Sequence, residues 1–98
     1  MAGTMLKLEF AQDAEEQLST LGEVDRRRLS GWFEHLRNFP NDDSIQKLAR
    51  RVETYPEEFV YPTTYDWVIS FRLTEDAVVI TSVFRKRSLQ AFEAAGRG

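Results

Sequence analysis

Residues Trp67–Arg87, WVISFRLTEDAVVITSVFRKR, give the strongest indication of the fold. Aromatic and β-branched residues dominate two runs of this stretch, and such residues favour strands. The polar segment Thr74–Asp76 separates the runs, which is typical of an antiparallel hairpin. Side chains of a strand alternate between its two faces, so the first run presents two different surfaces. One face carries Trp67, Ile69, Phe71 and Leu73, and the other carries Val68, Ser70 and Arg72.

A first strand and two helices are expected ahead of this hairpin. Residues 5–10 alternate apolar and polar side chains, which predicts a short strand. From Ala11 the apolar residues recur every three or four positions, so a first helix begins there and ends at Gly22. A longer helix follows, and Pro40 ends it. The apolar stripe of the longer helix consists of Val24, Leu29, Trp32, Phe33, Leu36 and Phe39.

Three smaller features complete the expected elements. Gly31 weakens the longer helix by roughly 1 kcal/mol relative to alanine, which indicates close approach of another element. Residues 45–51, IQKLARR, form a short segment whose N-cap is expected at Asp43 or Ser44. Phe59–Tyr61 predicts a further strand before the hairpin.

This order of elements predicts an α+β fold. The N-terminal strand and the later antiparallel strands form one sheet, and the helical hairpin packs on one face of that sheet. The other face is expected to stay partly open, with basic residues around it, which is the usual form of a binding surface. The chain reads as a single domain over residues 1–98, with 1–4 and 94–98 expected to be flexible.

Composition excludes several classes of site. The chain has 98 residues, no cysteine and one histidine, so cysteine chemistry is absent and a metal centre is not expected. No cofactor is expected either. The longest apolar run is far shorter than the ~20 residues of a membrane helix, and the N-terminus lacks the pattern of a signal peptide. We therefore expect a soluble, cytoplasmic protein without a membrane partner.

The distribution of charge is more informative than its sum. The formal net charge is −3, which argues against tight non-specific binding to nucleic acid. Cations nevertheless gather in three places, at Arg26–Arg28, at Lys47 with Arg50 and Arg51, and at Arg85–Arg87. The last cluster follows the final strand directly.

The sequence resembles the RelE/ParE superfamily of toxins from bacterial type II toxin–antitoxin modules. The resemblance rests on the order strand, helical hairpin, aromatic strand, acidic turn and valine-rich last strand ending in Arg85–Arg87. Leu21 and Gly22 between the helices and Lys47 and Leu48 after them also match. The resemblance covers residues 5 to about 93.

The resemblance implies a toxin that a cognate antitoxin holds silent. In the RelE branch it implies metal-independent cleavage of messenger RNA on the ribosome, in which cations stabilise the charge that develops on the phosphate. Lys86 is the best match to the catalytic arginine of the family, with Arg85 and Arg87 beside it. The family's other arginine falls on Val68, and its tyrosine falls on Phe92, which has no hydroxyl.

Further residues are candidates for binding RNA or a protein partner. They are Arg50, Arg51, Arg72, Tyr61 and Tyr65. The tyrosines also fit a packing role, since aromatic residues are common in strands. Glu57 and Glu58 can act as a base, as a glutamate does in some relatives, or lie solvated after a turn.

Three classes of function remain open at this point. The first is a ribosome-dependent mRNA endoribonuclease with a degraded catalytic site. The second is a ParE-type inhibitor that binds DNA gyrase without catalysing a reaction. The third is a catalytically silent module that binds another protein. All three include a protein partner, and an antitoxin segment is expected to cross the open sheet face and Arg85–Arg87.

Overall fold

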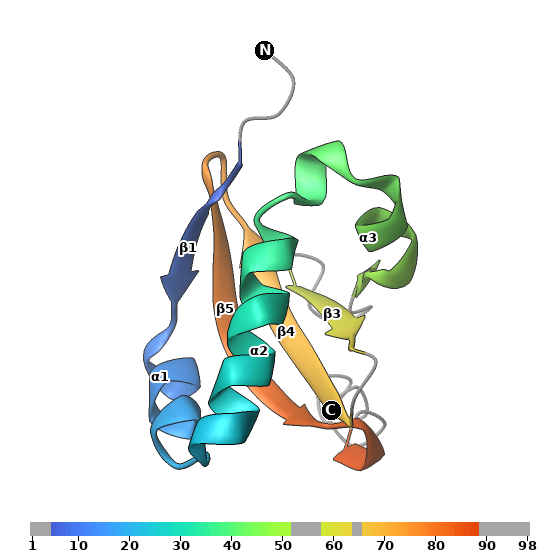
Figure 1. Cartoon of the computed structure of the whole chain (residues 1–98). Helices are drawn as coiled ribbons and strands as arrows, with labels where there is room; N and C mark the ends of the chain where they lie inside the picture. The colour runs from blue at the N-terminus through green and yellow to red at the C-terminus, as the bar shows by residue number, and fades with distance from the viewer. Residues whose placement is uncertain (1–4, 52–57, 64–65, 89–98) are drawn as a thin grey trace, which may run out of the picture.

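The computed structural model describes residues 5–51, 58–63 and 66–88, which form one mixed sheet with helices on it (Figure 1). The strands follow the spatial order β1-β5-β4-β3-β2. Their bounds are Lys7–Phe10 (β1), Arg50–Arg51 (β2), Glu58–Pro62 (β3), Trp67–Leu73 (β4) and Ala77–Arg85 (β5). The helices are Gln12–Ser19 (α1), Glu23–Leu36 (α2) and Asp43–Leu48 (α3), with 3₁₀ turns at Phe39–Asn41 and Lys86–Ser88. The predicted α+β fold is confirmed.

The hairpin predicted from the sequence forms the centre of the sheet. β4 and β5 are antiparallel, and the turn between them is closed by the Thr74 N–H, which donates to the Ala77 carbonyl at 2.9 Å. The Ala77 N–H donates in turn to the Thr74 hydroxyl at 3.0 Å. β1 lies along the other side of β5 and runs parallel to it, from Lys7 opposite Ala77 to Phe10 opposite Ile80. The N-terminal strand therefore closes one edge of the sheet.

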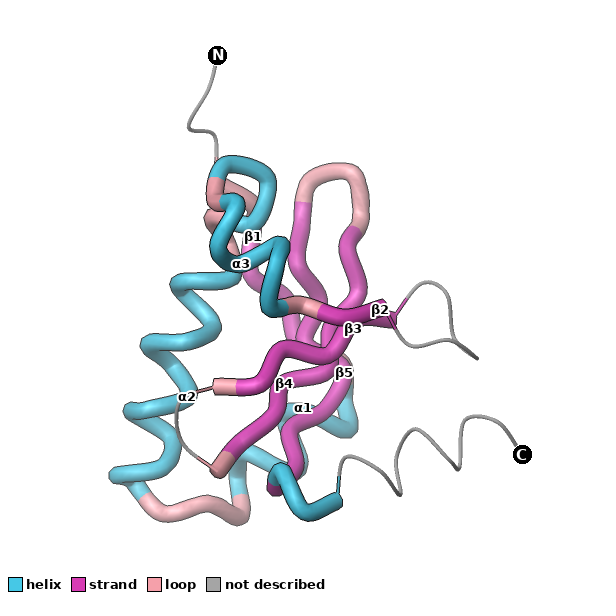
Figure 2. Tube along the Cα trace, turned by 90° about the vertical axis from the view of Figure 1, so that its right-hand side faces the viewer, coloured by secondary structure: helices cyan, strands magenta, loops and turns pink. Residues whose placement is uncertain are grey.

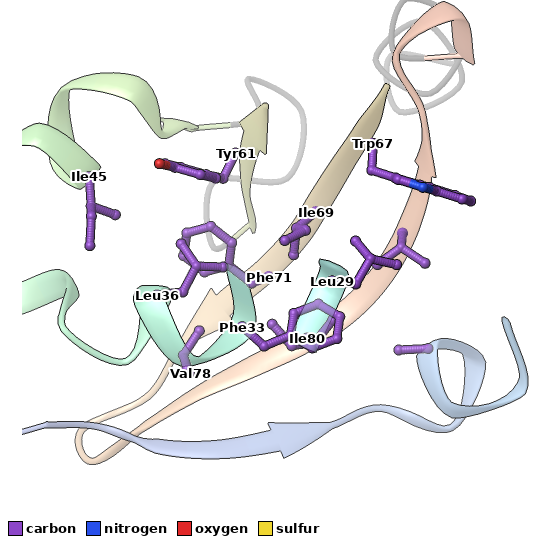
Figure 3. Packing of buried hydrophobic residues seen from close by; sticks show 12 residues of the cluster. Leu29, Phe33, Leu36, Ile45, Tyr61, Trp67, Ile69, Phe71, Val78 and Ile80 are labelled. Atoms are coloured by element: carbon purple, nitrogen blue, oxygen red, sulfur yellow. The ribbon is translucent and has the colours of Figure 1, made fainter. Parts of the chain in front are cut away.

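α2 lies on one side of the sheet, which Figure 2 shows in a view turned by 90°, and Ala14 of α1 belongs to the same core cluster as the buried residues of α2. α2 buries Leu29, Phe33 and Leu36, which recur at three and four residues on one stripe. Figure 3 shows these side chains directed at residues of β4 and β5, including Ile69, Phe71, Val78 and Ile80. We call this the helix-covered face of the sheet. It contains most of the apolar core.

Three predictions about α2 are wrong. The helix was expected to run to Pro40 with Phe39 on its stripe, but it ends at Leu36, and Phe39 begins a 3₁₀ turn. Val24 was expected on the buried stripe, but it is 64% exposed. Val24 precedes Leu29 by five residues, so at 100° per residue it points about 140° away from the stripe. Gly31 was expected to touch another element, yet a Cβ added there would meet no atom within 4 Å.

The segment after α2 also differs from the expectation. Asp42 is the N-cap of α3, because its side chain accepts hydrogen bonds from the N–H groups of Ser44 and Ile45. α3 ends at Leu48, and Arg50 and Arg51 form β2 instead of continuing the helical segment. The extended backbone of Ala49 turns the chain so that β2 pairs with β3.

The sheet face away from α1 and α2 was expected to be partly open, but the residues in its middle are buried. Val60 and Val68 are buried there and pack with Phe84 in a second, smaller cluster. Ser70 on the same face is also fully buried. None of the helices in the described ranges has the length and apolar character that a membrane span requires.

Candidate functional site

Strand alternation divides the predicted basic residues between the two faces of the sheet. Residues directly opposite each other on antiparallel strands share a face. Arg50 is opposite Val60 and Arg72 is opposite Glu58, so both arginines belong to the face away from α1 and α2. The strand pairing therefore brings two of the predicted binding residues to a common surface.

The carboxylate of Glu58 is the centre of that surface. The hydroxyls of Ser70 and Thr81 each donate to Glu58 Oε2 at 2.8 Å, and the two hydroxyl oxygens lie 2.9 Å apart. Arg72 Nε lies 3.6 Å from Glu58 Oε1. The Glu58 side chain is 18% exposed, whereas that of Arg72 is 47% exposed. We call the side of the sheet that carries Arg50, Glu58, Ser70, Arg72 and Thr81 the polar face.

A β-bulge brings Thr81 into this network. The pairing of β4 and β5 shifts between Ser70, opposite Ser82, and Phe71, opposite Ile80. Thr81 is the extra residue of the bulge, and bulges commonly redirect a side chain in this way. Because the shift lies beside Ser70, the Thr81 hydroxyl reaches the same carboxylate oxygen as the Ser70 hydroxyl.

Glu58 is thus bound and half-buried, where the sequence also allowed a solvated residue. Sequence reasoning missed Ser70 and Thr81 as its partners. The available signal was the polar Ser70 between the apolar residues of β4, on the same face as Arg72. Glu57 lies outside the described residues.

The side chains of Arg51 and Arg85 lie on the opposite, helix-covered side of the sheet, against aromatic rings. Arg85 is opposite Trp67, and its guanidinium carbon lies 4.0 Å from the centre of the Trp67 ring. It also pairs with Asp66 at 3.6 Å. Arg51 lies 5.3 Å from the centre of the Phe59 ring. Both cations have partners on the helix-covered side, so they do not join Arg50 and Arg72.

Lys86 and Arg87 continue past the end of β5 in an exposed 3₁₀ turn. The Lys86 N–H donates to the Asp66 carbonyl at 2.8 Å, which ties this turn to the start of β4. Among the described residues, neither side chain forms an ion pair. Arg72 is opposite Val79, six residues before Arg85, so Arg72 and this strand end are about 20 Å apart. The predicted site residues therefore do not form one cluster.

Tyr61 faces the helices and is only 2% exposed. Its ring lies 5.8 Å from that of Trp32 and 6.4 Å from that of His35. Burial, and secondly the charge of Asp42, raise the pKa of the Tyr61 phenol above its usual value. This placement favours the packing role over a binding role. Tyr65 and Phe92 lie outside the described residues.

The described residues contain no group of three or more His, Cys, Asp or Glu side chains arranged to hold a metal ion. The polar face carries the Glu58 carboxylate with Arg72 Nε 3.6 Å from it, and Arg50 lies on the same face. A carboxylate can accept a proton, and a guanidinium can bind a phosphate oxygen.

Solved structures with similar architecture belong to toxin–antitoxin proteins. The RelBE2 toxin–antitoxin complex of Mycobacterium tuberculosis matches with a TM-score of 0.68 and 15% identity, over 83% of this chain and 98% of that chain. The isolated RelE toxin of E. coli matches with a TM-score of 0.64 and 18% identity, over 94% of this chain and 97% of that chain. The chain has the RelE fold.

The intact RelBE toxin–antitoxin complex of E. coli agrees with this result. Its TM-score is 0.64 at 14% identity, and the match covers 82% of this chain and 95% of that chain. No protein-family model matches the sequence, and neither does any curated protein. The likeness to RelE is therefore a likeness of fold.

Proposed function

We propose that the protein is the toxin of a toxin–antitoxin pair and that a cognate antitoxin is its partner. The observation that carries this proposal is the RelE fold, shared over nearly the whole length of proteins solved as toxin–antitoxin complexes. The exposed Lys86 and Arg87 support it further, because they offer an acidic antitoxin segment a site at the end of β5.

For the toxic activity we favour metal-independent cleavage of messenger RNA on the ribosome. Glu58 Oε1 takes the proton of a ribose 2′-hydroxyl, and the 2′-oxygen attacks the adjacent phosphorus. The bond from phosphorus to the 5′-oxygen breaks, and water protonates that oxygen. Arg72 and Arg50 stabilise the charge on the phosphate oxygens. Two hydroxyl donors hold the Glu58 carboxylate in place for this role.

Arg85, Lys86 and Arg87 have a different task in this proposal. Since they lie about 20 Å from Arg72 along the strands, they bind the RNA backbone away from the bond that is cleaved. Lys86 and Arg87 are exposed and suit such contacts. Messenger RNA and ribosomes are cytoplasmic, so we place the protein in the cytoplasm.

A silent binding module is the second candidate. Arg72 pairs with Glu58 and Arg85 pairs with Asp66, so two of the candidate cations are already partly neutralised within the chain. A ParE-type action on DNA gyrase would not need the polar face for catalysis.

The test is to induce the chain in a bacterial host, with and without the product of the adjacent gene. The proposal predicts growth arrest that the adjacent gene relieves, with transcripts cut inside their coding regions. Arrest with a DNA-damage response and intact transcripts would support gyrase as the target. The absence of arrest at high soluble expression would contradict the toxin proposal and support the silent module.

A further inference from the structure

Arg85 differs from its neighbours Lys86 and Arg87 because two partners hold its side chain in one place. Its guanidinium carbon lies 4.0 Å from the centre of the Trp67 ring, and its Nη1 lies 3.6 Å from Asp66 Oδ2. A guanidinium is planar, and at this distance it covers one face of the indole. Its opposite face is therefore a flat surface that points away from Trp67.

The parts of this arrangement are fixed from behind. Trp67 is 7% exposed and belongs to the main core cluster, and Figure 3 shows it at one end of the labelled core residues. The Lys86 N–H donates to the Asp66 carbonyl at 2.8 Å, so the start of β4 and the end of β5 keep their relative position. The indole, the guanidinium and the carboxylate are thus in place before a ligand binds.

The same groups are accessible to a ligand. The Arg85 side chain is 40% exposed, and the Asp66 side chain is 58% exposed. In the part of the chain that the structure describes, Arg85 has no other ring contact and no other ion pair. We call Trp67, Arg85 and Asp66 the base site.

We propose that the base site binds an unpaired guanine of RNA, stacked on the Arg85 guanidinium with its Watson–Crick edge at Asp66. Proteins commonly bind unpaired bases by stacking them on aromatic rings and guanidinium planes. Lys86 and Arg87 follow in an exposed turn and suit contacts with the adjacent phosphates. This inference rests on the RNA contact proposed above for Arg85–Arg87, and it adds the reading of a base to that contact.

The carboxylate of Asp66 selects guanine among the four bases. Guanine carries two N–H donors side by side on its Watson–Crick edge, at N1 and N2, and one carboxylate accepts from both. Adenine and cytosine place a ring nitrogen acceptor beside their amino group, and uracil places carbonyls on both sides of its N–H. Each of these three bases would bring an acceptor against the negative charge. Arg85 therefore supplies affinity, and Asp66 supplies selectivity.

An acidic peptide suits the base site less well. The charges of Arg85 and Asp66 offset each other, so a carboxylate that approached Arg85 would also meet the carboxylate of Asp66. A flat, neutral ring with N–H donors avoids this conflict.

The base site lies apart from the groups proposed for cleavage. Arg72 is about 20 Å away along the strands. The bound guanine is therefore not one of the two nucleotides that flank the cleaved bond. The base site sets a preference at a separate position of the RNA and takes no part in the chemistry.

The experiment measures the affinity of the purified chain for fluorescein-labelled RNA hexanucleotides by fluorescence anisotropy. The probes are UUUGUU and the same sequence with adenine or inosine in place of guanine, all with 2′-O-methyl groups so that no 2′-hydroxyl can attack. UUUGUU is expected to bind about tenfold more tightly than the adenine probe. Inosine keeps the ring and the N1–H but lacks the N2 amino group, so its affinity should lie between the two. Equal affinities for the three probes would overturn the inference.

Asp66→Asn tests the selectivity. The amide offers a single acceptor oxygen, so the preference for guanine over adenine should fall to within about twofold. Asp13→Asn is the matched control, because it makes the same chemical change at an exposed residue of α1 and should keep the full preference. A preference that survives Asp66→Asn would show that Asp66 does not read the base.

Arg85→Lys separates stacking from charge. Lysine keeps the positive charge but has no plane, so all three probes should bind at least about fivefold more weakly. Lys86→Ala should also weaken all three probes equally, but it should reduce the salt dependence of binding as well. Wild-type affinity of Arg85→Lys would exclude the stacked base.

The sequence around the cut sites in cells identifies the source of the guanine. A guanine of the transcript predicts that G is enriched at a fixed distance from the cut, and that Asp66→Asn removes this enrichment. A guanine of ribosomal RNA predicts no enrichment, together with weaker growth arrest by Asp66→Asn than by Asp13→Asn.

The outcomes separate this inference from the proposals it rests on. If the chain binds all three probes equally, only the guanine site fails, and the RNA contact of Arg85–Arg87 stands. If it binds none of them, the guanine site and that RNA contact both fail. Growth arrest and its relief by the adjacent gene test the toxin proposal independently of either result.

Discussion

The two faces of the sheet differ in what holds their side chains. On the helix-covered face, Ile69, Phe71 and Ile80 pack against α2 and need only apolar neighbours of suitable size. On the polar face, Glu58 and Ser70 are held by directed hydrogen bonds that require a particular strand pairing. The first face stabilises the fold, and the second presents polar groups in a defined geometry.

β4 contributes residues to both faces. Its odd-numbered residues from Trp67 to Phe71 complete the core, and its even-numbered residues Val68, Ser70 and Arg72 lie on the other face, where only Arg72 is exposed. A substitution at either face therefore tests one role at a time. The expected effects fall in a clear order.

The largest effect is expected in the core of the helix-covered face. Phe71 is fully buried and contacts the rings of Phe39 and Phe59. Phe71→Ala should lower the free energy of unfolding by about 3–5 kcal/mol, because it removes apolar burial and leaves a cavity. Urea unfolding measures this loss. Val24→Ala on the exposed side of α2 is the control, with a change within about 0.5 kcal/mol.

A smaller effect is expected on the polar face. Glu58→Ala should lower the free energy of unfolding by about 1–3 kcal/mol, because the buried Ser70 hydroxyl loses an acceptor. Adding Ser70→Ala should lower the free energy of unfolding by less in the Glu58→Ala variant than in the wild type, since the two residues share one hydrogen-bond network. Additive effects in urea unfolding would contradict the network.

Substitutions at Arg85 and Lys86 compare a cation that contacts Trp67 and Asp66 with an exposed cation. Arg85→Ala should cost about 0.5–1 kcal/mol, because the stack on Trp67 and the contact with Asp66 are lost. Lys86→Ala should change stability by less than about 0.5 kcal/mol. Thermal unfolding measures both, and a larger loss for Lys86 would contradict the assignment of these side chains.

The smallest effect at neutral pH is expected for Tyr61→Phe. The folded state raises the pKa of Tyr61 above its usual value near 10, through burial first and the charge of Asp42 second. Above about pH 10 the unfolded chain therefore releases this proton more readily than the folded chain, and stability falls as the pH rises. Tyr61→Phe should make that alkaline decline shallower in urea unfolding at pH 9 to 11. An unchanged decline would show that Tyr61 is not the residue responsible.

The helix-covered face could be predicted from the sequence because alternation and helical spacing determine it. The β4–β5 hairpin, the helical hairpin and the Leu29–Leu36 stripe all follow from the positions of apolar residues. Val24 was misplaced because it lies within the right segment but at the wrong angle around α2.

The polar face could not be predicted in the same way. Its network depends on the pairing of Glu58 with Arg72 and on the bulge that adds Thr81, and both are properties of strands distant in sequence. The resemblance to RelE placed the basic cluster correctly at the end of β5. It did not reveal that Arg85 stacks on Trp67 while Lys86 stays exposed.

The most direct test of the division between the two faces is growth arrest on induction of Glu58→Gln, compared with the wild type and with Glu23→Gln at equal soluble levels. Glu23 also pairs with an arginine, but on the exposed surface of α2. We predict that Glu58→Gln abolishes the arrest and the cleavage of transcripts, whereas Glu23→Gln arrests growth like the wild type. Full arrest with Glu58→Gln would contradict the account, because the polar face would then not be the working surface.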